Sequence, residues 1–255
     1  MKRVNVFVVI LSLFLVVSFF TTALAQEDLK TKVMEIDGAR LEGKLDTIIK
    51  RYEQQTKENP NDPVLHYLLG IAYLYSEFDI KDATFDNALK EFIRAKTLDP
   101  KMKYVNYSLG TTYWYREEYD NAFDAYRAEI EIDPEYGWNY YNLGSAYEGL
   151  KKWDKAWSQY IIAIDKDPTI HRAHNNLGTI ALNWKGDYFR ALEAFKTALE
   201  LRPNELLYKK NYNETIRKLK ALKESVDKGE LTLDAGKLKK LNSLDLKEVD
   251  IEEKQ

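Results

Sequence analysis

Apolar residues recur at intervals of three and four along most of the chain from residue 41 to residue 219, a pattern typical of amphipathic helices. Prolines interrupt this pattern at Pro100, Pro134, Pro168 and Pro203. The residue before a proline is pushed out of the α region, so each of these prolines predicts the end of a helix. Asp62-Pro63 adds a helix start, with a capping side chain and a first-turn proline. The pattern predicts an all-α chain of successive helices.

A Leu-Gly dipeptide returns four times, with its glycines at spacings of 40, 34 and 34 residues: Gly70, Gly110, Gly144 and Gly178. A second set of small residues lies downstream of each glycine, and each is followed four residues later by an aromatic residue. These pairs are Ala88 and Phe92, Ala122 and Tyr126, Ala156 and Tyr160, and Ala191 and Phe195. Glycine inside a helix costs about 1 kcal/mol relative to alanine. We therefore expect each glycine to admit the close approach of a second helix.

Small, aromatic and proline positions that recur together at a fixed period resemble the tetratricopeptide repeat (TPR), a helix–turn–helix unit of 34 residues. The resemblance covers four full repeats, over about 62–101, 102–135, 136–169 and 170–204. It implies an all-α, right-handed superhelical solenoid of antiparallel helix pairs.

Two repeats depart from this pattern. The first has six extra residues within 76–87, which predicts a longer exposed loop, and the fourth has one extra residue near Trp184-Lys185-Gly186. A position that is usually bulky, near the start of the first helix, is filled by Tyr140 in the third repeat. The other three repeats have His66, Asn106 and His174 there.

The segments on either side of the repeats have different characters. Residues 26–61 carry a helical period that includes Leu41 and Tyr52, which predicts an N-terminal capping helix or half-repeat. Residues 204–225 form another amphipathic pattern and predict a C-terminal capping helix. Residues 226–255 are rich in lysine and acidic residues with few aromatics, so we expect a mobile, solubilising tail, with a short helix around Gly236–Leu244 as the alternative.

The first 25 residues have the pattern of an export signal. Lys2 and Arg3 precede an apolar run from Val6 to Phe20, and small residues stand at Ala23 and Ala25. This predicts a signal peptide cleaved between Ala25 and Gln26, and a periplasmic or secreted mature protein. The alternative is an uncleaved inner-membrane anchor, for which the run is short, because a spanning helix needs about 20 residues.

By the resemblance, the first helices of the repeats line a concave groove that binds a partner. The implied groove residues are aromatic in the earlier repeats and asparagine-rich in the later ones: Tyr67, Tyr104, Tyr107, Trp114, Trp138, Tyr141, Asn142, Arg172, Asn175, Asn176 and Asn183. Aromatic rings offer contact area and amides can pair with an extended backbone, so the expected ligand is an extended peptide. Arg172 is the only basic residue among them, which argues against a clamp for a C-terminal carboxylate.

The sequence offers little catalytic or cofactor chemistry. It has no cysteine, and no phosphate-binding loop, dinucleotide fingerprint, zinc-protease motif or nucleophile elbow. His171 and His174 are three residues apart on one predicted helix, but a metal site needs further ligands. We therefore expect no cofactor, no metal and no enzyme activity. A metal carrier or enzyme that uses these two histidines remains a remote alternative.

A net charge of −3 without a basic block argues against a general nucleic-acid binder. The pattern as a whole predicts an interaction module of the bacterial cell envelope with a protein partner, and no integral membrane role once the signal is removed. Self-assembly into a homo-oligomeric scaffold is the alternative within the same class. The sequence identifies neither the partner nor the oligomeric state.

Overall fold

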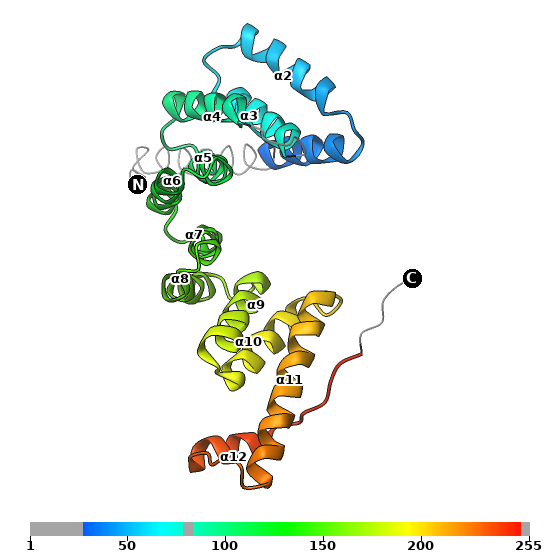
Figure 1. Ribbon diagram of the computed structural model, residues 1–255. Helices are drawn as coiled ribbons and strands as arrows, with labels where there is room; N and C mark the ends of the chain where they lie inside the picture. The colour runs from blue at the N-terminus through cyan, green and yellow to red at the C-terminus, as the bar shows by residue number, and fades with distance from the viewer. Residues whose placement is uncertain (1–27, 79–83, 251–255) are drawn as a thin grey trace, which may run out of the picture. The chain divides into compact units, whose positions relative to one another are not determined.

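The computed structural model describes residues 28–78 and 84–250, and in these ranges every regular element is a helix (Figure 1). The signal peptide expected over 1–25 lies outside the described residues. The chain divides into two compact units, unit 1 over Met1–Ala125 and unit 2 over Tyr126–Gln255. We describe each unit by itself.

An unlabelled helix over residues 28–41 opens unit 1. It is followed in unit 1 by α2 (Leu45–Glu58), α3 (Pro63–Glu77), α4 (Asp86–Leu98) and α5 (Val105–Tyr115), and α6 (Tyr119–Ile132) spans the unit boundary. Unit 2 continues with α7 (Gly137–Gly149), α8 (Trp153–Lys166), α9 (His171–Ile180), the π-helical turn Ala181–Lys185, α10 (Tyr188–Leu201), α11 (Leu206–Asp227) and α12 (Ala235–Ser243).

The helices pack in consecutive pairs, and the glycines explain how closely they do so. α3 packs on α4, α7 on α8, and α9 on α10. A Cβ atom added at Gly70 would lie 2.6 Å from the Phe92 ring, and one at Gly144 would lie 2.8 Å from the Tyr160 ring. At Gly178 the corresponding distance to a ring carbon of Phe195 is 2.8 Å. Three of the four glycines therefore make room for the aromatic ring of the second helix, as the spacing predicts.

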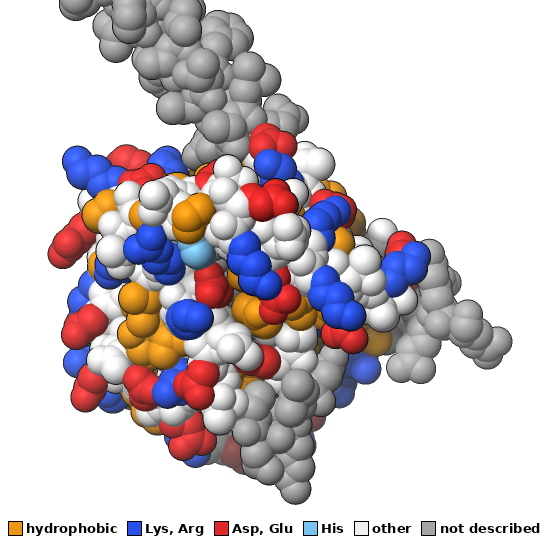
Figure 2. Space-filling model, turned by 90° about the horizontal axis from the view of Figure 1, so that it is seen from above, with side chains coloured by type: hydrophobic (Ala, Val, Ile, Leu, Met, Phe, Trp, Pro, Cys, Tyr) orange, Lys and Arg blue, Asp and Glu red, His pale blue; other side chains and the backbone are white. Residues whose placement is uncertain are grey.

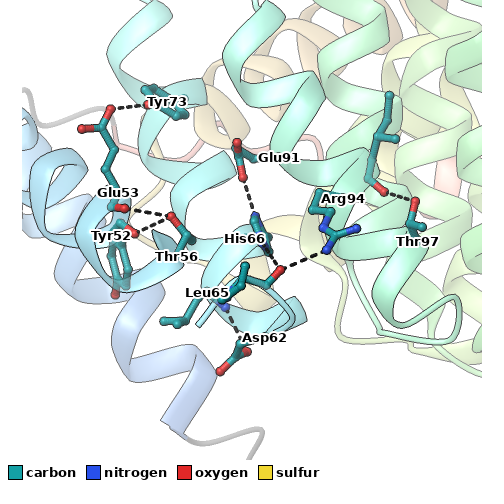
Figure 3. A network of polar contacts seen from close by, with 12 residues as sticks. Tyr52, Glu53, Thr56, Asp62, Leu65, His66, Tyr73, Glu91, Arg94 and Thr97 are labelled. Carbon is teal, nitrogen blue, oxygen red and sulfur yellow. Dashed lines mark hydrogen bonds and ion pairs between the residues drawn. The ribbon is translucent and has the colours of Figure 1, made fainter. Parts of the chain in front are cut away.

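In three of the repeats, the side chain at the usually bulky position near the start of the first helix bonds to the proline turn that precedes the repeat. His66 Nε2 lies 3.1 Å from the carbonyl oxygen of Pro60, and His174 Nε2 lies 2.9 Å from that of Pro168. Tyr140 donates its hydroxyl to the Pro134 carbonyl at 3.1 Å. Figure 3 shows that His66 also reaches Glu91 on α4, with Nδ1 and Oε2 2.6 Å apart. Histidine and tyrosine thus perform the same structural task in different repeats.

The extra residue of the fourth repeat is accommodated without a loop. The chain passes from α9 directly into the π-helical turn Ala181–Lys185, which takes up one residue more than an α-turn. Gly186 then ends the turn with φ 63°, a left-handed conformation that glycine adopts without steric cost.

The insertion in the first repeat differs from the expected exposed loop at its C-terminal end. Residues 79–83 lie outside the described ranges, but Phe85 is buried. Its ring centroid lies 6.0 Å from that of Phe78 and 5.6 Å from that of Tyr115. The loop is anchored there because its phenylalanine has an apolar site to fill.

The N-terminal segment, for which the sequence predicts a capping helix or half-repeat, forms two helices within residues 28–58. Gly43 has φ 69° and breaks the helical pattern between residues 41 and 45. Leu41, which the sequence pattern places on the apolar face, is 76% exposed beside this break. Arg51 of α2 pairs with Glu35 of the preceding helix at 2.7 Å, and α2 packs on α3.

The structure describes the C-terminal segment up to residue 250 and contains the short helix that the sequence allows around Gly236–Leu244. Residues 235–243 form α12, whose Leu241 is completely buried in a cluster with Leu192, Ile216 and Leu219. The following segment over 244–250, which we call the strap, runs beside α11. Leu244 and Leu246 of the strap pack against the same cluster and supply apolar contacts that the charged composition of this segment obscures.

One asparagine of α11 holds the strap through both the nitrogen and the oxygen of its side-chain amide. Asn213 Nδ2 donates to the Val249 carbonyl at 2.8 Å, and Val249 N donates to Asn213 Oδ1 at 2.8 Å. Glu248 adds exposed ion pairs to Arg217 and Lys220. Asn213 stands ten residues after Pro203, the position that glycine holds in the four repeats. The strap therefore lies against α11 at a position where a repeat would require glycine.

Candidate functional site

In unit 1 the residues expected to line a groove differ in exposure. Tyr67 is 5% exposed and packs on Phe92 with ring centroids 5.8 Å apart, so it belongs to the core and offers a partner little surface. Tyr104 precedes α5 and packs against the same core. Tyr107 is 37% exposed, whereas Trp114 is half-buried against Tyr119.

In unit 2 the predicted residues lie on α7, α9 and the π-helical turn. Trp138, Tyr141 and Asn142 are half-buried on α7, and Arg172 is exposed at the start of α9. Asn183 is exposed in the π-helical turn. Asn175 is buried and Asn176 half-buried, and these two residues belong to a network of polar contacts that does not include the other predicted residues.

A continuous network of polar side chains connects four helices of unit 2. We call it the polar cluster: Ser145 and Glu148 from α7, Tyr160 from α8, Asn175 and Asn176 from α9, and Asn211 from α11. Its members are joined to one another by side-chain hydrogen bonds.

The centre of the cluster is one carboxylate oxygen. Asn176 Nδ2 donates to Glu148 Oε2 at 3.1 Å, and the Tyr160 hydroxyl donates to the same oxygen. Asn176 Nδ2 also lies 3.0 Å from the Tyr160 hydroxyl, and Ser145 Oγ lies 3.3 Å from it. Three helices therefore position this oxygen.

Asparagine side chains extend the network towards α11. Asn175 Nδ2 donates to Asn176 Oδ1 at 3.2 Å, and Asn211 Nδ2 donates to Asn175 Oδ1 at 2.8 Å. Asn211 and Asn176 each stand eight residues after the preceding proline, and so does Asn142. Three consecutive first helices thus carry an asparagine at the same repeat position.

The carboxyl group of Glu148 has an unusual electrostatic setting. Burial raises its pKa, and the hydrogen bonds from Tyr160 and Asn176 oppose this effect only in part. Among the described residues, no lysine or arginine forms an ion pair with Glu148. A half-buried carboxylate that lacks a cation is stabilised when a positive group approaches it.

Tyr160 belongs to both the core and the cluster. Its ring is completely buried against Gly144, while its hydroxyl reaches Glu148. Burial, followed by the charge of Glu148, raises its pKa, so the phenol stays protonated and acts as a donor. Its ring centroid lies 5.8 Å from that of Tyr141, which in turn meets Trp138 edge to face at 5.3 Å. An aromatic surface thus borders the polar cluster.

Among the four repeats, the third alone has a carboxylate at this place. At the positions that hold Ser145, Glu148 and Tyr160, the first repeat has Ile71, Leu74 and Phe92, all buried. The second has Thr111, Trp114 and Tyr126, and the fourth has Thr179, Leu182 and Phe195.

By the resemblance, Ser145 and Glu148 stand at groove positions of the third repeat, and the structure adds Tyr160 and Asn211 to the polar cluster. The sequence pattern assigns Tyr160 to the core and the helix over 204–225 to a cap, so it does not predict their bonds. A repeat-by-repeat comparison of the Glu148 position would have shown a carboxylate where the other repeats have Leu74, Trp114 and Leu182.

The two histidines considered for a metal site serve other bonds. His171 Nδ1 lies 2.6 Å from the Tyr208 hydroxyl, whereas His174 Nε2 meets the Pro168 carbonyl. Burial, aided by the charges of Arg202 and Arg172, lowers the pKa of His171. Within 28–78 and 84–250, no three histidine, cysteine or acidic side chains are grouped so that they could hold a metal ion.

A shallow pocket of about 320 Å³ lies elsewhere on unit 2, between α8, α9 and α10. Its lining residues are Ile161, Ile164, His174, Leu177, Arg190, Glu193, Ala194 and Thr197. None of the predicted groove residues contributes to it.

Charges on the face drawn in Figure 2 are mixed, with lysine and arginine beside aspartate and glutamate and hydrophobic patches between them. Among the helices of the described ranges, none combines the length and the apolar character needed to cross a membrane.

Comparisons with known proteins agree with the repeat pattern. Family models described as tetratricopeptide repeat match residues 104–136 and 141–205. A crystal structure of MamA is 27% identical, with a TM-score of 0.55 over 66% of this chain and 94% of MamA. No curated protein matches the sequence significantly.

Two further structures support the fold. MamA (residue 41 to the end) from Desulfovibrio magneticus RS-1 is 23% identical, with a TM-score of 0.54 over 69% of this chain and 96% of that one. TTC0263, a thermophilic TPR protein in Thermus thermophilus, is 20% identical, with a TM-score of 0.56 over 74% and 98%. The family models identify tetratricopeptide repeats over residues 104–136 and 141–205, and the periodic glycines, the paired helices and the similar structures show that the chain has an all-α helical-repeat fold.

Proposed function

We propose that this chain is a non-catalytic interaction module of a bacterial cell envelope that binds an extended segment of a partner protein over the first helices of unit 2. The observation that carries this proposal is the polar cluster around Glu148. TPR proteins are in general interaction modules rather than enzymes, and the match to this family supports the class of function.

The asparagines suit the backbone of an extended peptide. An asparagine amide has both donors and an acceptor, so it can pair with a peptide N–H and a peptide C=O at once. Asn213 already holds the strap in this way, with Val249 N and O as its two partners. Asn142, Asn176 and Asn211 repeat the same side chain along α7, α9 and α11. A peptide crossing these helices would meet the amides of Asn142 and Asn211, whereas the amide of Asn176 between them is engaged by Glu148, Tyr160 and Asn175.

Glu148 and its aromatic neighbours would select side chains. The carboxylate has no cationic partner among the described residues, so a lysine or arginine of the ligand would supply one. Trp138 and Tyr141 would take an apolar side chain close to it. The ligand is therefore an extended segment that carries a basic residue next to an apolar one.

The cellular location rests on residues 1–25. The basic start, the apolar run and the small residues at Ala23 and Ala25 support export and cleavage before Gln26. The mature chain would then work in the periplasm or outside the cell. An uncleaved segment would hold the same repeats at the inner membrane.

A peptide-display selection tests the proposal. The chain from Gln26 onward would be used to select extended peptides from a randomised library, and we expect lysine or arginine to be enriched beside apolar residues. Glu148→Gln should lose the preference for basic residues. Both hydrogen bonds to Glu148 end on the same oxygen, Oε2, so the single amide oxygen of glutamine can accept both.

The matched control is Glu53→Gln in unit 1. The Tyr73 hydroxyl donates to Glu53 Oε1 at 2.6 Å, so this variant removes a carboxylate that is also held by a tyrosine. It should select the same peptides as the unmodified chain. Identical selection by Glu148→Gln and the unmodified chain would refute the assignment of the site.

A further inference from the structure

Three of the five tryptophans of the chain lie close together on unit 2. Trp153 and Trp157 share one face of α8, four residues apart, and Trp184 belongs to the π-helical turn. Lys185 connects the two helices: its Nζ lies 4.9 Å from the Trp157 ring centroid and 4.5 Å from that of Trp184. We call Trp153, Trp157, Trp184, Lys185 and Arg190 the tryptophan edge.

The tryptophan edge combines exposed aromatic surface with positive charge. Trp184 is 44% exposed, and the guanidinium of Arg190 lies 5.3 Å from the Trp157 ring centroid. The two segments that form this edge, 151–157 and 184–190, hold five basic residues and two acidic ones, in a chain whose net charge is −3. Lys185 and Arg190 thus place positive charge beside the indole rings, and Lys185 Nζ also lies 3.7 Å from Asp154 Oδ1.

This combination matches the surface of an anionic lipid bilayer. Indole rings settle at the depth of the lipid headgroups, where one part of the ring is wet and the other apolar. Lysine and arginine beside them reach the lipid phosphates. The apolar run from Val6 to Phe20 brings the chain to a membrane during export, which places such a surface within reach.

We propose that the tryptophan edge docks unit 2 on anionic lipid headgroups as a peripheral contact. A nucleic acid is the less suitable partner, because Asp154 and Asp187 stand within the same two segments and the chain as a whole is acidic. The contact is separate from the polar cluster, and it rests on the proposed function only for the export that brings the chain to a membrane.

Vesicle sedimentation tests this proposal. The chain from Gln26 onward keeps every contact described within 28–250, and circular dichroism would verify its helical content. We expect it to sediment with vesicles of phosphatidylglycerol and phosphatidylcholine, to show a blue shift of tryptophan emission, and to be released by added salt. It should not sediment with phosphatidylcholine alone.

The test variant carries Trp184→Ser, Lys185→Gln and Arg190→Gln. Each basic residue near an anionic surface contributes about 1 kcal/mol, so losing both should lower the partition constant about thirty-fold, before the loss of the indole is counted. A second variant with only Lys185→Gln and Arg190→Gln retains all three tryptophans of the edge. It should show the charge-dependent part of the loss.

The matched control is Lys196→Gln, Lys218→Gln and Leu231→Ser, which removes two exposed charges and one exposed apolar side chain elsewhere on unit 2. Its binding to vesicles should lie close to that of the unmodified chain, because salt screens charges that lie away from the lipid surface. Equal binding by the test variant, binding to phosphatidylcholine alone, or binding to single-stranded DNA in place of vesicles would each overturn the proposal.

Discussion

The helix pairs α3/α4 and α7/α8 share one way of packing, and we compare them at three positions around the contact between the glycine and the aromatic ring. Both place a glycine against an aromatic ring, Gly70 against Phe92 and Gly144 against Tyr160. In α3/α4 the neighbouring positions are Ile71 and Leu74, both buried and apolar. In α7/α8 these positions hold a serine and a glutamate whose side chains meet the tyrosine hydroxyl.

The difference shows how a core position can also contribute a polar group to the site that we propose. A tyrosine packs against the glycine as well as a phenylalanine does, because ring packing requires only the ring. The hydroxyl then extends beyond the core and holds a carboxylate towards the first helices. The scaffold of the third repeat is retained, and one added oxygen atom connects it to the polar cluster.

The most severe test of this shared design truncates the ring in either repeat. Phe92→Ala and Tyr160→Ala should each lower the free energy of unfolding by about 3–5 kcal/mol, because a completely buried aromatic side chain leaves a cavity. Chemical denaturation followed by circular dichroism measures the change. A loss confined to one of the two variants would show that the repeats are not built alike.

Exchanging the ring types gives a sharper comparison. Phe92→Tyr should cost about 2 kcal/mol, because its hydroxyl would be buried beside Ile71 and Leu74 without a partner. Denaturation midpoints measure this cost. The double variant Phe92→Tyr with Leu74→Glu would supply the missing partner, and recovery of part of the stability would confirm the reason.

The reverse exchange should have a smaller effect. Tyr160→Phe keeps the ring packing and removes the hydroxyl's bond to the half-buried Glu148 carboxylate together with its contacts to Asn176 and Ser145, so we expect a loss of about 1–2 kcal/mol. The pKa of Glu148 should rise further, since the phenol lowers it in the intact protein. Titration of the Glu148 carboxyl by NMR measures this shift, and an unchanged pKa would show that the bond does not form.

The smallest effect is a dependence on pH that only the third repeat should show. The folded state raises the pKa of Glu148 above its ordinary value of 4.5, so it binds the proton more tightly than the unfolded chain does. Its contribution to stability is complete below pH 4.5 and is lost as the pH rises through the folded-state pKa.

Comparison with Glu148→Gln isolates this contribution, because other carboxyl groups titrate alike in both proteins. The stability of the variant relative to the unmodified chain should increase as the pH rises above 4.5 and then level off. Parallel stability curves would show that burial of Glu148 does not perturb its ionisation. Leu74 holds this position in α3, so no such term arises there.

The sequence was sufficient for the helix pairs but not for the polar cluster. Glycine, aromatic and proline positions each act locally, so their spacing predicts the contact between Gly144 and Tyr160. The bond from Asn176 to Glu148 depends on how α9 is rotated against α7, and no periodicity within either helix specifies that rotation. The sequence therefore indicated the first helices as the expected groove, with Glu148 at one of its positions, but not the bonds that make this carboxylate the centre of the polar cluster.

Two local features were recognisable in part. The extra residue before Gly186 was visible as a change of spacing, but a π-helical turn and a loop are equally compatible with it. The C-terminal segment was classified by its lysines and acidic residues. Leu241 and the apolar residues that follow it pack this segment against the rest of unit 2 instead, because a few well-placed leucines suffice to fill a small apolar site.

Asn213 also limits how such a protein can lengthen by gene duplication. A copied block of repeats inserted before α11 would present the usual glycine to its new second helix. A block added after α11 would have to pass an aromatic ring over Asn213, whose amide is engaged with Val249. Growth of this array in evolution or in the laboratory should therefore proceed by insertions ahead of residue 206, with α11, α12 and the strap inherited as one terminal cassette.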